Sequence, residues 1–521
     1  MDFIRKHLKR LQTLKLLLTS LCFALAFCPN LLLAELTVGS PFTDNAILQR
    51  ELPVPVWGSA GPGSQVTVEF AGQTKTVVAD TDGNWKVQLE PMEANAVPDE
   101  LRIATAKSQL VFSNVLVGEV WICSGQSNMQ FQAHRVPEVK ALIGKMKNIR
   151  SFEVKRTVAF SEQDSVQGEW VEHHPDSAVA FSFAYFLEQA GDVPVGIILA
   201  CWGSSSIEAW MPRDMTKTIP HFKTIMDEFD ADTKTREEIN RILDGRKPWP
   251  NKDDIFLRRQ PNILYNAMIH PIVPYACRGL VWYQGERNTQ SMHGMLKKPW
   301  FSRNSGMLKY GNTLTAWIQR YRQQWNNEEM HFLVVMLPGF HKRMETGPKM
   351  ERLAGADNPT PHSWAWMRES QLKALELENT AVVNTIDLGD VTNVHPKDKM
   401  PIGQRLALLA ARDTLGQDIK AEGPMMKNVE VQGARLIVNF SHAEGLQTQD
   451  GQAPVGFWLA DDSAQWFRAE AELNGETVVL SSPQLKKPLY VRYAFSGKPN
   501  VNLTNEAGLP AYPFRTDDFE P

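Results

Sequence analysis

Several features are scarce in this sequence, and each absence excludes a class of function. Neither sign of charge dominates, because 55 lysines and arginines stand against 59 aspartates and glutamates, for a net charge of −4. These charges are scattered along the chain, which argues against nucleic acid as a partner. No CxxC pair and no HExxH motif occurs, so we expect neither a metal site nor a cofactor. Beyond residue 34, no apolar run is long enough to span a bilayer, and no membrane span is expected there.

Cysteine is also rare. Of the five cysteines, Cys22 and Cys28 lie near the amino terminus, which leaves Cys123, Cys201 and Cys277. Three scattered cysteines are too few for a disulfide scaffold. Because each lies in or beside an apolar run, we predict that they are buried as small hydrophobic side chains.

The amino terminus is the exception to the even distribution of charge. Five basic residues precede an apolar segment at 16–27, a pattern typical of a signal peptide that is cleaved after Ala34. The pattern predicts export, to the periplasm or the extracellular space. A retained membrane anchor is one alternative. A lipoprotein box ending at Cys28 is another, although Phe27 fits it poorly.

The length of 521 residues predicts two to four domains, and changes in the pattern of apolar and polar residues indicate where they divide. Residues 35–115 show short alternating runs broken by glycine and proline, typical of a small β-sandwich. From 116 to 415 nearly continuous apolar strands alternate with helical periods, which indicates an α/β domain with a parallel sheet. Within it, the charged segment at about 213–260 is predicted as a helical insertion. The alternation of apolar and polar residues returns at 416–521, which predicts a carboxyl-terminal β domain.

The predicted strands and helices of the central domain locate its functional edge. Strands are expected at 117–122, 195–200, 279–283, 332–336 and 382–386, and helices at 310–325, 364–377 and 402–415. Ligands of open α/β sheets bind beyond the carboxyl ends of the strands. Polar loops with glycine follow there, and they contain Ser127, Gly203, Gln284 and His395. A hydroxyl, an imidazole and hydrogen-bond donors are what serine-mediated acyl transfer requires.

At this point the residues resemble a known family. The stretches CSGQSNM (123–129), WYQGE (282–286) and HPKDK (395–399) resemble the sialate O-acetylesterases of the SGNH hydrolase superfamily. So do LQR (48–50) and PFRTDD (513–518), so the resemblance extends over most of the chain. It implies a three-layer α/β/α domain flanked by β-sandwich-like domains, and a serine esterase that removes O-acetyl groups from sialic acid. A related family acts on acetylated plant polysaccharides, so acetylxylan or another polysaccharide remains an alternative substrate.

The resemblance also implies roles for individual residues. Ser127 matches the nucleophile and, through its N–H, one donor of the oxyanion hole; Gly203 and Gln284 match the other two donors, and His395 matches the general base. Asn128, Glu286 and Asn288 lie in the matching blocks and are expected to support the site.

The acid that would orient His395 is uncertain from the sequence. Many SGNH enzymes carry an aspartate three residues before the histidine, where this chain has Thr392. Asp390 is the preferred candidate because it ends the preceding strand, and Asp387 is the second. A dyad whose imidazole is held by a backbone carbonyl is the third possibility.

Particular side chains bear on the substrate and on two alternative functions. Trp202, Trp210 and Trp282 could stack on a sugar but are expected to be core residues. A carboxylate of the substrate could bind to Arg287, Arg368 or Arg405. A non-catalytic glycan-binding protein is an alternative of another class, which the intact Ser127, Gln284 and His395 disfavour. A glycosidase with Glu208 and Glu286 as its paired carboxylates would leave Ser127 and His395 without a role.

Overall fold

The structure is a computed structural model that describes residues 35–289, 306–341, 359 and 363–519, and its chain divides into two compact units. The first comprises residues up to Val38 with Val56–Val87 and Arg102–Val111; the second comprises Gly39–Pro55, Gln88–Leu101 and Phe112–Pro521. The predicted signal peptide lies outside the described residues. No helix of the described part is long and apolar enough to cross a membrane.

The first unit consists of short antiparallel strands. β3 (Gln65–Phe70) pairs with β4 (Gln73–Val78), and its other edge pairs with the end of β6 (Asn95–Ala104). β5 (Asn84–Leu89), which pairs with β2 (Val54–Ser59), alternates strictly between exposed and buried side chains. This is the period of two expected for a strand with one face in a core and one in water.

The second unit contains the parallel sheet that carries the site. Its strand order is β13-β12-β11-β7-β10-β8-β9. The strands are β7 (Gln109–Gly125), β8 (Ile149–Glu153), β9 (Trp170–Val171), β10 (Val195–Cys201), β11 (Gly279–Tyr283), β12 (His331–Val335) and β13 (Thr380–Val383). The neighbours from β13 to β8 are all parallel, and β9 pairs antiparallel with β8. The α/β class with a parallel sheet is therefore confirmed.

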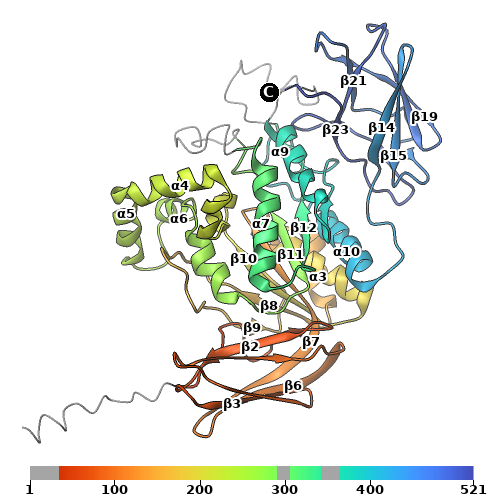
Figure 1. The fold of residues 1–521 in the computed structure, drawn as a ribbon. Helices are drawn as coiled ribbons and strands as arrows, with labels where there is room; N and C mark the ends of the chain where they lie inside the picture. The colour runs from red at the N-terminus through yellow and green to blue at the C-terminus, as the bar shows by residue number, and fades with distance from the viewer. Residues whose placement is uncertain (1–34, 290–305, 342–358, 360–362, 520–521) are drawn as a thin grey trace, which may run out of the picture. The chain divides into compact units, whose positions relative to one another are not determined.

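Helices cover both faces of this sheet (Figure 1). On one face, Trp121 of β7 meets Phe183 of α3 (Ala178–Gly191), which packs along α10 (Met400–Leu415). On the other face, Trp282 of β11 lies against Trp317 of α7 (Tyr310–Trp325), which packs with α9 (Ser363–Leu372). Burial on both faces explains why these strands read as continuous apolar runs.

The predicted strands and helices of the central domain are all present, although some observed elements were not predicted. The strand at 279–283 and the helix at 310–325 have the predicted bounds. The segment at 213–260 is helical, with α4 (Pro220–Ala231), α5 (Thr233–Leu243) and α6 (Asn251–Leu257). Strand β8 and helix α3 were not predicted. β7 runs uninterrupted through the predicted boundary at 115/116, and the domain limits stay a prediction.

The carboxyl-terminal part of the second unit is all β. One four-stranded sheet consists of β14 (Met425–Gln432), β15 (Arg435–Ser441), β20 (Thr477–Ser481) and β19 (Glu470–Asn474). The other consists of β18 (Phe467–Arg468), β17 (Phe457–Ala460), β21 (Tyr490–Tyr493) and β23 (Phe514–Arg515). Side chains of β15 alternate between buried and half-buried, as in a sheet with one covered face.

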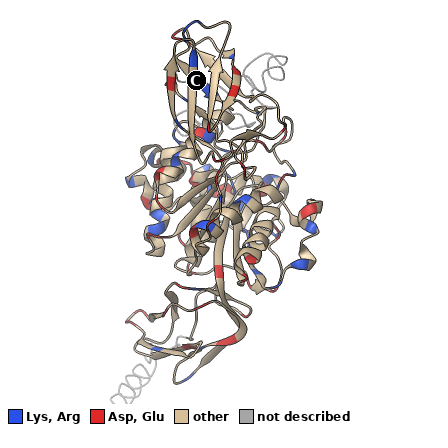
Figure 2. Cartoon of the chain, turned by 90° about the vertical axis from the view of Figure 1, so that its right-hand side faces the viewer, with Lys and Arg blue, Asp and Glu red and all other residues tan. Residues whose placement is uncertain are grey.

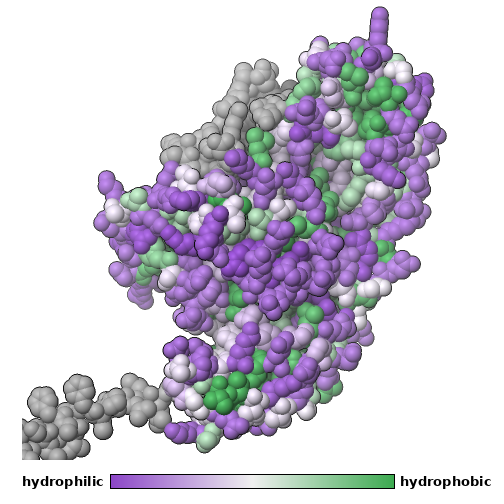
Figure 3. All heavy atoms as spheres, viewed as in Figure 1, coloured by the Kyte–Doolittle hydropathy of each residue, from purple (hydrophilic) through white to green (hydrophobic). Residues whose placement is uncertain are grey.

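The surface agrees with the charge balance read from the sequence. Basic and acidic residues are interspersed along the chain (Figure 2), and the face in Figure 3 is mostly hydrophilic, with small apolar patches. The remaining cysteines Cys123, Cys201 and Cys277 are buried and free, as predicted.

Candidate active site

Ser127 lies at the carboxyl edge of the sheet because of how β7 ends. Gly125, the last residue of β7, is paired with Cys201 of β10 and Tyr283 of β11. Its φ is +135°, and a Cβ atom there would come within 2.2 Å of the Tyr283 carbonyl oxygen, so only glycine fits. The chain turns after this glycine. Ser127 is half-buried between the buried side chains of Gln126 and Asn128, at the point where the loops of three parallel strands meet.

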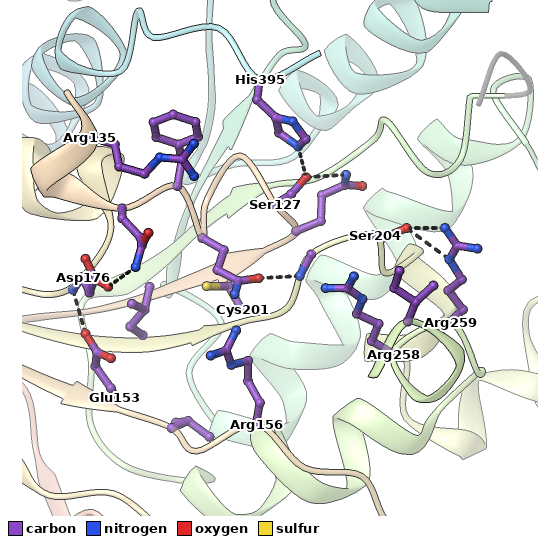
Figure 4. A pocket seen from close by; sticks show the side chains of 18 of the residues that line it. Ser127, Arg135, Glu153, Arg156, Asp176, Cys201, Ser204, Arg258, Arg259 and His395 are labelled. Carbon is purple, nitrogen blue, oxygen red and sulfur yellow. Dashed lines mark hydrogen bonds between the residues drawn. The ribbon is translucent and has the colours of Figure 1, made fainter. Parts of the chain in front are cut away.

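His395 reaches Ser127 from the loop between β13 and α10. Its Nε2 lies 2.8 Å from the Ser127 Oγ, within hydrogen-bond distance (Figure 4). Burial lowers the pKa of the imidazole, and the charges of Lys399 and Arg135 lower it further. The neutral form is therefore favoured near pH 7, and neutral Nε2 can accept the hydroxyl proton.

The carboxylate of Asp390, the predicted orienting acid of His395, is hydrogen-bonded within its own loop. Asp390 Oδ1 accepts hydrogen bonds from the backbone N–H groups of Thr392 and Asn393, at 2.6 and 2.8 Å, and from the Thr392 hydroxyl. These bonds lower the pKa of this exposed carboxyl. Asp390 Oδ1 therefore caps its own turn, and the role of Asp390 as the orienting acid stays a prediction. No described carboxylate is hydrogen-bonded to His395.

Asp387, the second candidate for the orienting acid, is paired with Arg405. Its two carboxylate oxygens accept hydrogen bonds of 2.8 and 2.7 Å from the guanidinium of Arg405. This bidentate pair explains the role of Arg405, which had been considered as a ligand for a substrate carboxylate. The sequence could not show this pairing, because the two residues lie 18 positions apart on a loop and a helix.

Gly203 follows β10 and lies beside Ser127, as predicted. A Cβ atom on Gly203 would lie 3.2 Å from the Ser127 Cβ. Its backbone N–H donates a 2.7 Å hydrogen bond to the side-chain oxygen of Gln130, so this predicted oxyanion donor is engaged in the free protein. The N–H of Ser127, by contrast, has no hydrogen-bond partner within the described part of the chain.

The side chain of Gln284, a predicted oxyanion donor, is hydrogen-bonded away from the pocket, and its role as a donor stays a prediction. Its Nε2 lies 3.2, 3.1 and 2.9 Å from Gln126 Oε1, the Ser205 carbonyl oxygen and Asn288 Oδ1. Its Oε1 accepts from the hydroxyl of Tyr310. The side chain is fully buried and contributes nothing to the pocket wall. Gln284 therefore holds neighbouring loops together.

Gln126 places a side-chain amide beside Ser127, where the amide of Gln284 had been expected. Its Oε1 accepts hydrogen bonds from the Arg287 backbone N–H and from Gln284 Nε2, at 3.1 and 3.2 Å. With the oxygen held there, the Nε2 faces Ser127, 3.5 Å from its Oγ, and lines the pocket. Gln126 was not among the residues predicted from the sequence, although its place directly before Ser127 was a usable signal.

The three predicted supporting residues are all buried beside the site. Asn128 Nδ2 donates to Glu286 Oε1 at 2.5 Å and to the Val394 carbonyl oxygen at 3.0 Å. Asn288 Oδ1 accepts from Gln284, while its Nδ2 donates to both carboxylate oxygens of Glu208 at 3.2 and 3.0 Å. Neither Glu208 nor Glu286 lines the pocket, so they do not form the paired carboxylates of a glycosidase.

A cavity of about 730 Å³ opens next to Ser127 and His395. Its wall carries five basic side chains, Arg135, Arg156, Arg258, Arg259 and Lys397, and two acidic ones, Glu153 and Asp176. Figure 4 shows Arg156, Arg258 and Arg259 along one side of it. Both acids already accept local hydrogen bonds: Glu153 from the Asp176 backbone N–H, and Asp176 from Gln132. The cavity is therefore positive on balance.

The three arginines that the sequence offered as ligands for a substrate carboxylate, Arg287, Arg368 and Arg405, lie outside this cavity. Arg368 is fully buried and donates to four backbone carbonyls, those of Leu337, Pro338, Ser496 and Gly497. Arg287 does not line the cavity either. The predicted core role of the three tryptophans is confirmed, since Trp202, Trp210 and Trp282 are all fully buried. In the described part of the chain, no cluster of three or more His, Cys, Asp or Glu residues could hold a metal ion.

Comparison with known proteins agrees with this geometry. The family described as "Carbohydrate esterase, sialic acid-specific acetylesterase" matches residues 252–412. A crystal structure of a carbohydrate acetylesterase from Xanthomonas citri is 30% identical, covers 93% of this chain and 100% of that one, and superposes with a TM-score of 0.77. The sialate O-acetylesterase of Mus musculus is 24% identical over 88% of this chain and 89% of its own length. The Homo sapiens enzyme is 24% identical over 81% and 80%. The chain therefore belongs to the sialate O-acetylesterase family of carbohydrate esterases, and it is a carboxylic ester hydrolase.

Proposed function

We propose that this esterase removes O-acetyl groups from sialic acid, a sugar that carries a carboxylate, with Ser127 as nucleophile and His395 as general base. The observation that carries the choice of substrate is the basic wall of the cavity beside Ser127. A neutral polysaccharide such as acetylxylan has no anionic group for such a wall to bind.

The basic wall has guanidinium groups that are suited to a carboxylate. Within the described residues, Arg258 makes one ion pair, to Asp254 at 3.3 Å, and Arg259 donates only to the neutral hydroxyl of Ser204. The Arg156 side chain has no hydrogen bond or ion pair within the described part of the chain. Guanidinium groups bind carboxylates in a bidentate geometry, and a partly buried pair is stronger than an exposed one.

The proposed reaction is a two-step acyl transfer. Ser127 Oγ attacks the acetyl carbonyl carbon while His395 Nε2 takes the hydroxyl proton. The tetrahedral intermediate then expels the sugar oxygen, which receives that proton from the imidazolium. Water attacks the acetyl-serine with His395 again acting as base, and acetate leaves with Ser127 restored.

Three donors face the place where negative charge develops. They are the free N–H of Ser127, the Nε2 of Gln126 and the N–H of Gly203, which Gln130 occupies until the substrate displaces it. The Ser127 N–H and the Gln126 Nε2 are already in place, and donors held in place before the reaction stabilise an oxyanion without the cost of reorganisation.

The names of the relatives support the same substrate class. The curated relatives from mouse and human are sialate O-acetylesterases, and the crystal structure from Xanthomonas citri is of a carbohydrate acetylesterase.

A screen of acetate release tests the proposal. The wild-type protein is compared on O-acetylated sialic acid, acetylated xylan, acetylated neutral monosaccharides and p-nitrophenyl acetate. We expect acetylated sialic acid to be the best sugar substrate. Arg258→Gln and Arg156→Gln should lower kcat/KM for it by about tenfold or more each, as expected for loss of a charged hydrogen bond, and leave p-nitrophenyl acetate almost unchanged. Arg241→Gln, an exposed arginine paired with Glu238, is the matched control.

Other outcomes point to the alternatives. Preference for acetylated xylan with no effect of the arginine substitutions would favour a polysaccharide esterase. A Ser127→Ala variant that keeps full activity would contradict the nucleophile. Binding of the sugar without any release of acetate would indicate a non-catalytic glycan-binding protein.

We further infer that the chain is exported to the periplasm or the extracellular space. The support is the basic segment followed by the apolar residues 16–27. Sequencing of the amino terminus of the protein isolated from its source should find a start after Ala34. An intact Met1 would contradict cleavage, and a lipid on Cys28 would indicate the lipoprotein alternative.

A further inference from the structure

A buried cluster of three polar side chains joins the loop of Ser127 to the loop of His395. Asn128 lies at its centre: its Nδ2 donates to Glu286 Oε1 at 2.5 Å and to the Val394 carbonyl oxygen at 3.0 Å, and its Oδ1 accepts from Lys399 Nζ at 2.6 Å. Asn128 and Glu286 are 1% exposed and Lys399 is 0% exposed. Polar groups this deeply buried are costly unless they are paired, so the arrangement is specific.

The sequence positions of these partners show what the cluster holds. Asn128 directly follows Ser127, and Val394 directly precedes His395. Lys399 lies four residues beyond His395, at the start of α10. One amide therefore bonds to the histidine loop on both sides of His395 and lies next to the nucleophile.

An asparagine is suited to this position. Both of its amide hydrogens and its carbonyl oxygen are used, whereas an aspartate offers no donor and an alanine offers neither group. Burial raises the pKa of Glu286 to about 7 and lowers that of Lys399 to about 7, because each charged form loses its water. The Asn128 amide is hydrogen-bonded to both of these groups, as donor to Glu286 and as acceptor from Lys399.

The imidazole of His395 must be held in a fixed orientation to act as a base toward Ser127. In esterases with a triad, a carboxylate bonded to the second ring nitrogen fixes the orientation of the imidazole. Here Asp390 caps its own turn and Asp387 binds Arg405, so no described carboxylate does so. Among the described residues, the imidazole is hydrogen-bonded to the Ser127 side chain alone.

We propose that Asn128, supported by Glu286 and Lys399, is the positioning residue that places His395 against Ser127, in a site where no described carboxylate is hydrogen-bonded to the imidazole. It acts through the Val394 carbonyl and through Lys399, and does not touch the substrate. The inference rests on the proposed roles of Ser127 and His395.

The first experiment replaces Asn128 by aspartate, which has the same shape and lacks the donor. With p-nitrophenyl acetate, Asn128→Asp should lower kcat by about tenfold or more while KM changes less than about twofold, because a misplaced base affects the chemical step and not binding. The matched control is Asn505→Asp. Asn505 is also fully buried, and its Nδ2 donates to two carbonyls, those of Glu422 and His442, far along the chain from the site.

The control separates positioning from general stability. If Asn505→Asp lowers the thermal unfolding midpoint as much as Asn128→Asp and keeps its kcat, the proposal is supported. Equal losses of kcat in both variants, or unchanged kcat in Asn128→Asp, would overturn it.

A second pair of variants decides the matter if Asn128→Asp does not fold. Glu286→Gln keeps an oxygen acceptor for the Asn128 amide, and Glu286→Leu removes it. We expect Glu286→Gln to keep kcat within about threefold of wild type and Glu286→Leu to lose about tenfold. Similar kcat values in the two variants would refute the proposal.

Ser127→Ala and His395→Ala, measured beside these variants, distinguish the two levels of inference. If either of them remains active, the proposed function itself fails. If both are inactive and Asn128→Asp is not impaired, only the positioning role fails.

Discussion

The side-chain oxygen of Gln130 accepts a 2.7 Å hydrogen bond from the backbone N–H of Gly203, directly beside Ser127. The N–H that resemblance assigns to the oxyanion hole is therefore already occupied in the free protein. An oxyanion can use this donor only after Gln130 moves aside, which has a free-energy cost.

Removing this competitor should speed the reaction. We expect Gln130→Ala to raise kcat/KM for a small acetate ester by about fivefold, which corresponds to about 1 kcal/mol for one net hydrogen bond. Gln132→Ala is the control, because Gln132 lines the same cavity but donates to Asp176. Steady-state kinetics measure both. A loss of about tenfold in Gln130→Ala would show that Gln130 holds the Gly203 loop in place.

Gln126 should contribute directly to the transition state. Gln126→Ala removes an amide whose Nε2 lies 3.5 Å from Ser127 Oγ, and the loss of one oxyanion donor costs about 100-fold in kcat with little change in KM. Gln126→Glu, which keeps the shape and lacks the donor, should lose as much. If Gln126→Glu retained wild-type kcat, the amide would have no such role.

Asp390 should be dispensable for catalysis. Among the described residues, its carboxylate accepts hydrogen bonds only from residues 392 and 393. Asp390→Asn should therefore keep kcat within about threefold of wild type, far from the loss of about 10⁴ that follows when a triad acid is disabled. The same assay on Asp387→Asn is the comparison. A loss of about a thousandfold in Asp390→Asn would restore this residue as the orienting acid.

The pH dependence should reflect the lowered pKa of His395. Only the neutral imidazole can take the Ser127 proton, so kcat/KM should fall as the pH drops through that pKa, with a midpoint below the ordinary 6.5. Arg135→Gln removes a positive charge that lowers this pKa, and the acidic limb should therefore move to higher pH. The control Arg241→Gln should leave it in place. A midpoint at or above 6.5 in the wild type would contradict this account of the environment of His395.

Much of the site could be predicted from local sequence patterns. A continuous apolar strand that ends in glycine must turn at the sheet edge, which predicted the position of Ser127. The loops after parallel strands meet at one edge, which predicted that Gly203 and His395 lie beside it. Strand β11 and helix α7 were predicted with the correct bounds, because their residue patterns contrast sharply with the flanking segments.

Other elements were not recognisable from the sequence. Helix α3 has nine buried residues among its fourteen, so its apolar residues surround it and show little helical period. Strand β8 is only five residues long and contains Arg150, whose guanidinium reaches backbone carbonyls far along the chain. A pattern read along the sequence does not show such long-range satisfaction of a buried charge.

The sequence by itself determined the α/β class, the nucleophile candidate and its histidine, because apolar periodicity, glycine turns and the order of the loops are local properties. Only the tertiary structure decided the direction of each amide and carboxylate. Gln284 turned inward, Gln126 toward Ser127 and Asp387 onto Arg405, because buried polar groups are nearly always hydrogen-bonded to partners that only the fold brings near. The exposed carboxylate of Asp390 instead accepts hydrogen bonds from its own turn. The basic wall was likewise decided by folding, since Arg135, Arg156, Arg258 and Arg259 come from distant segments that meet only when the sheet is formed.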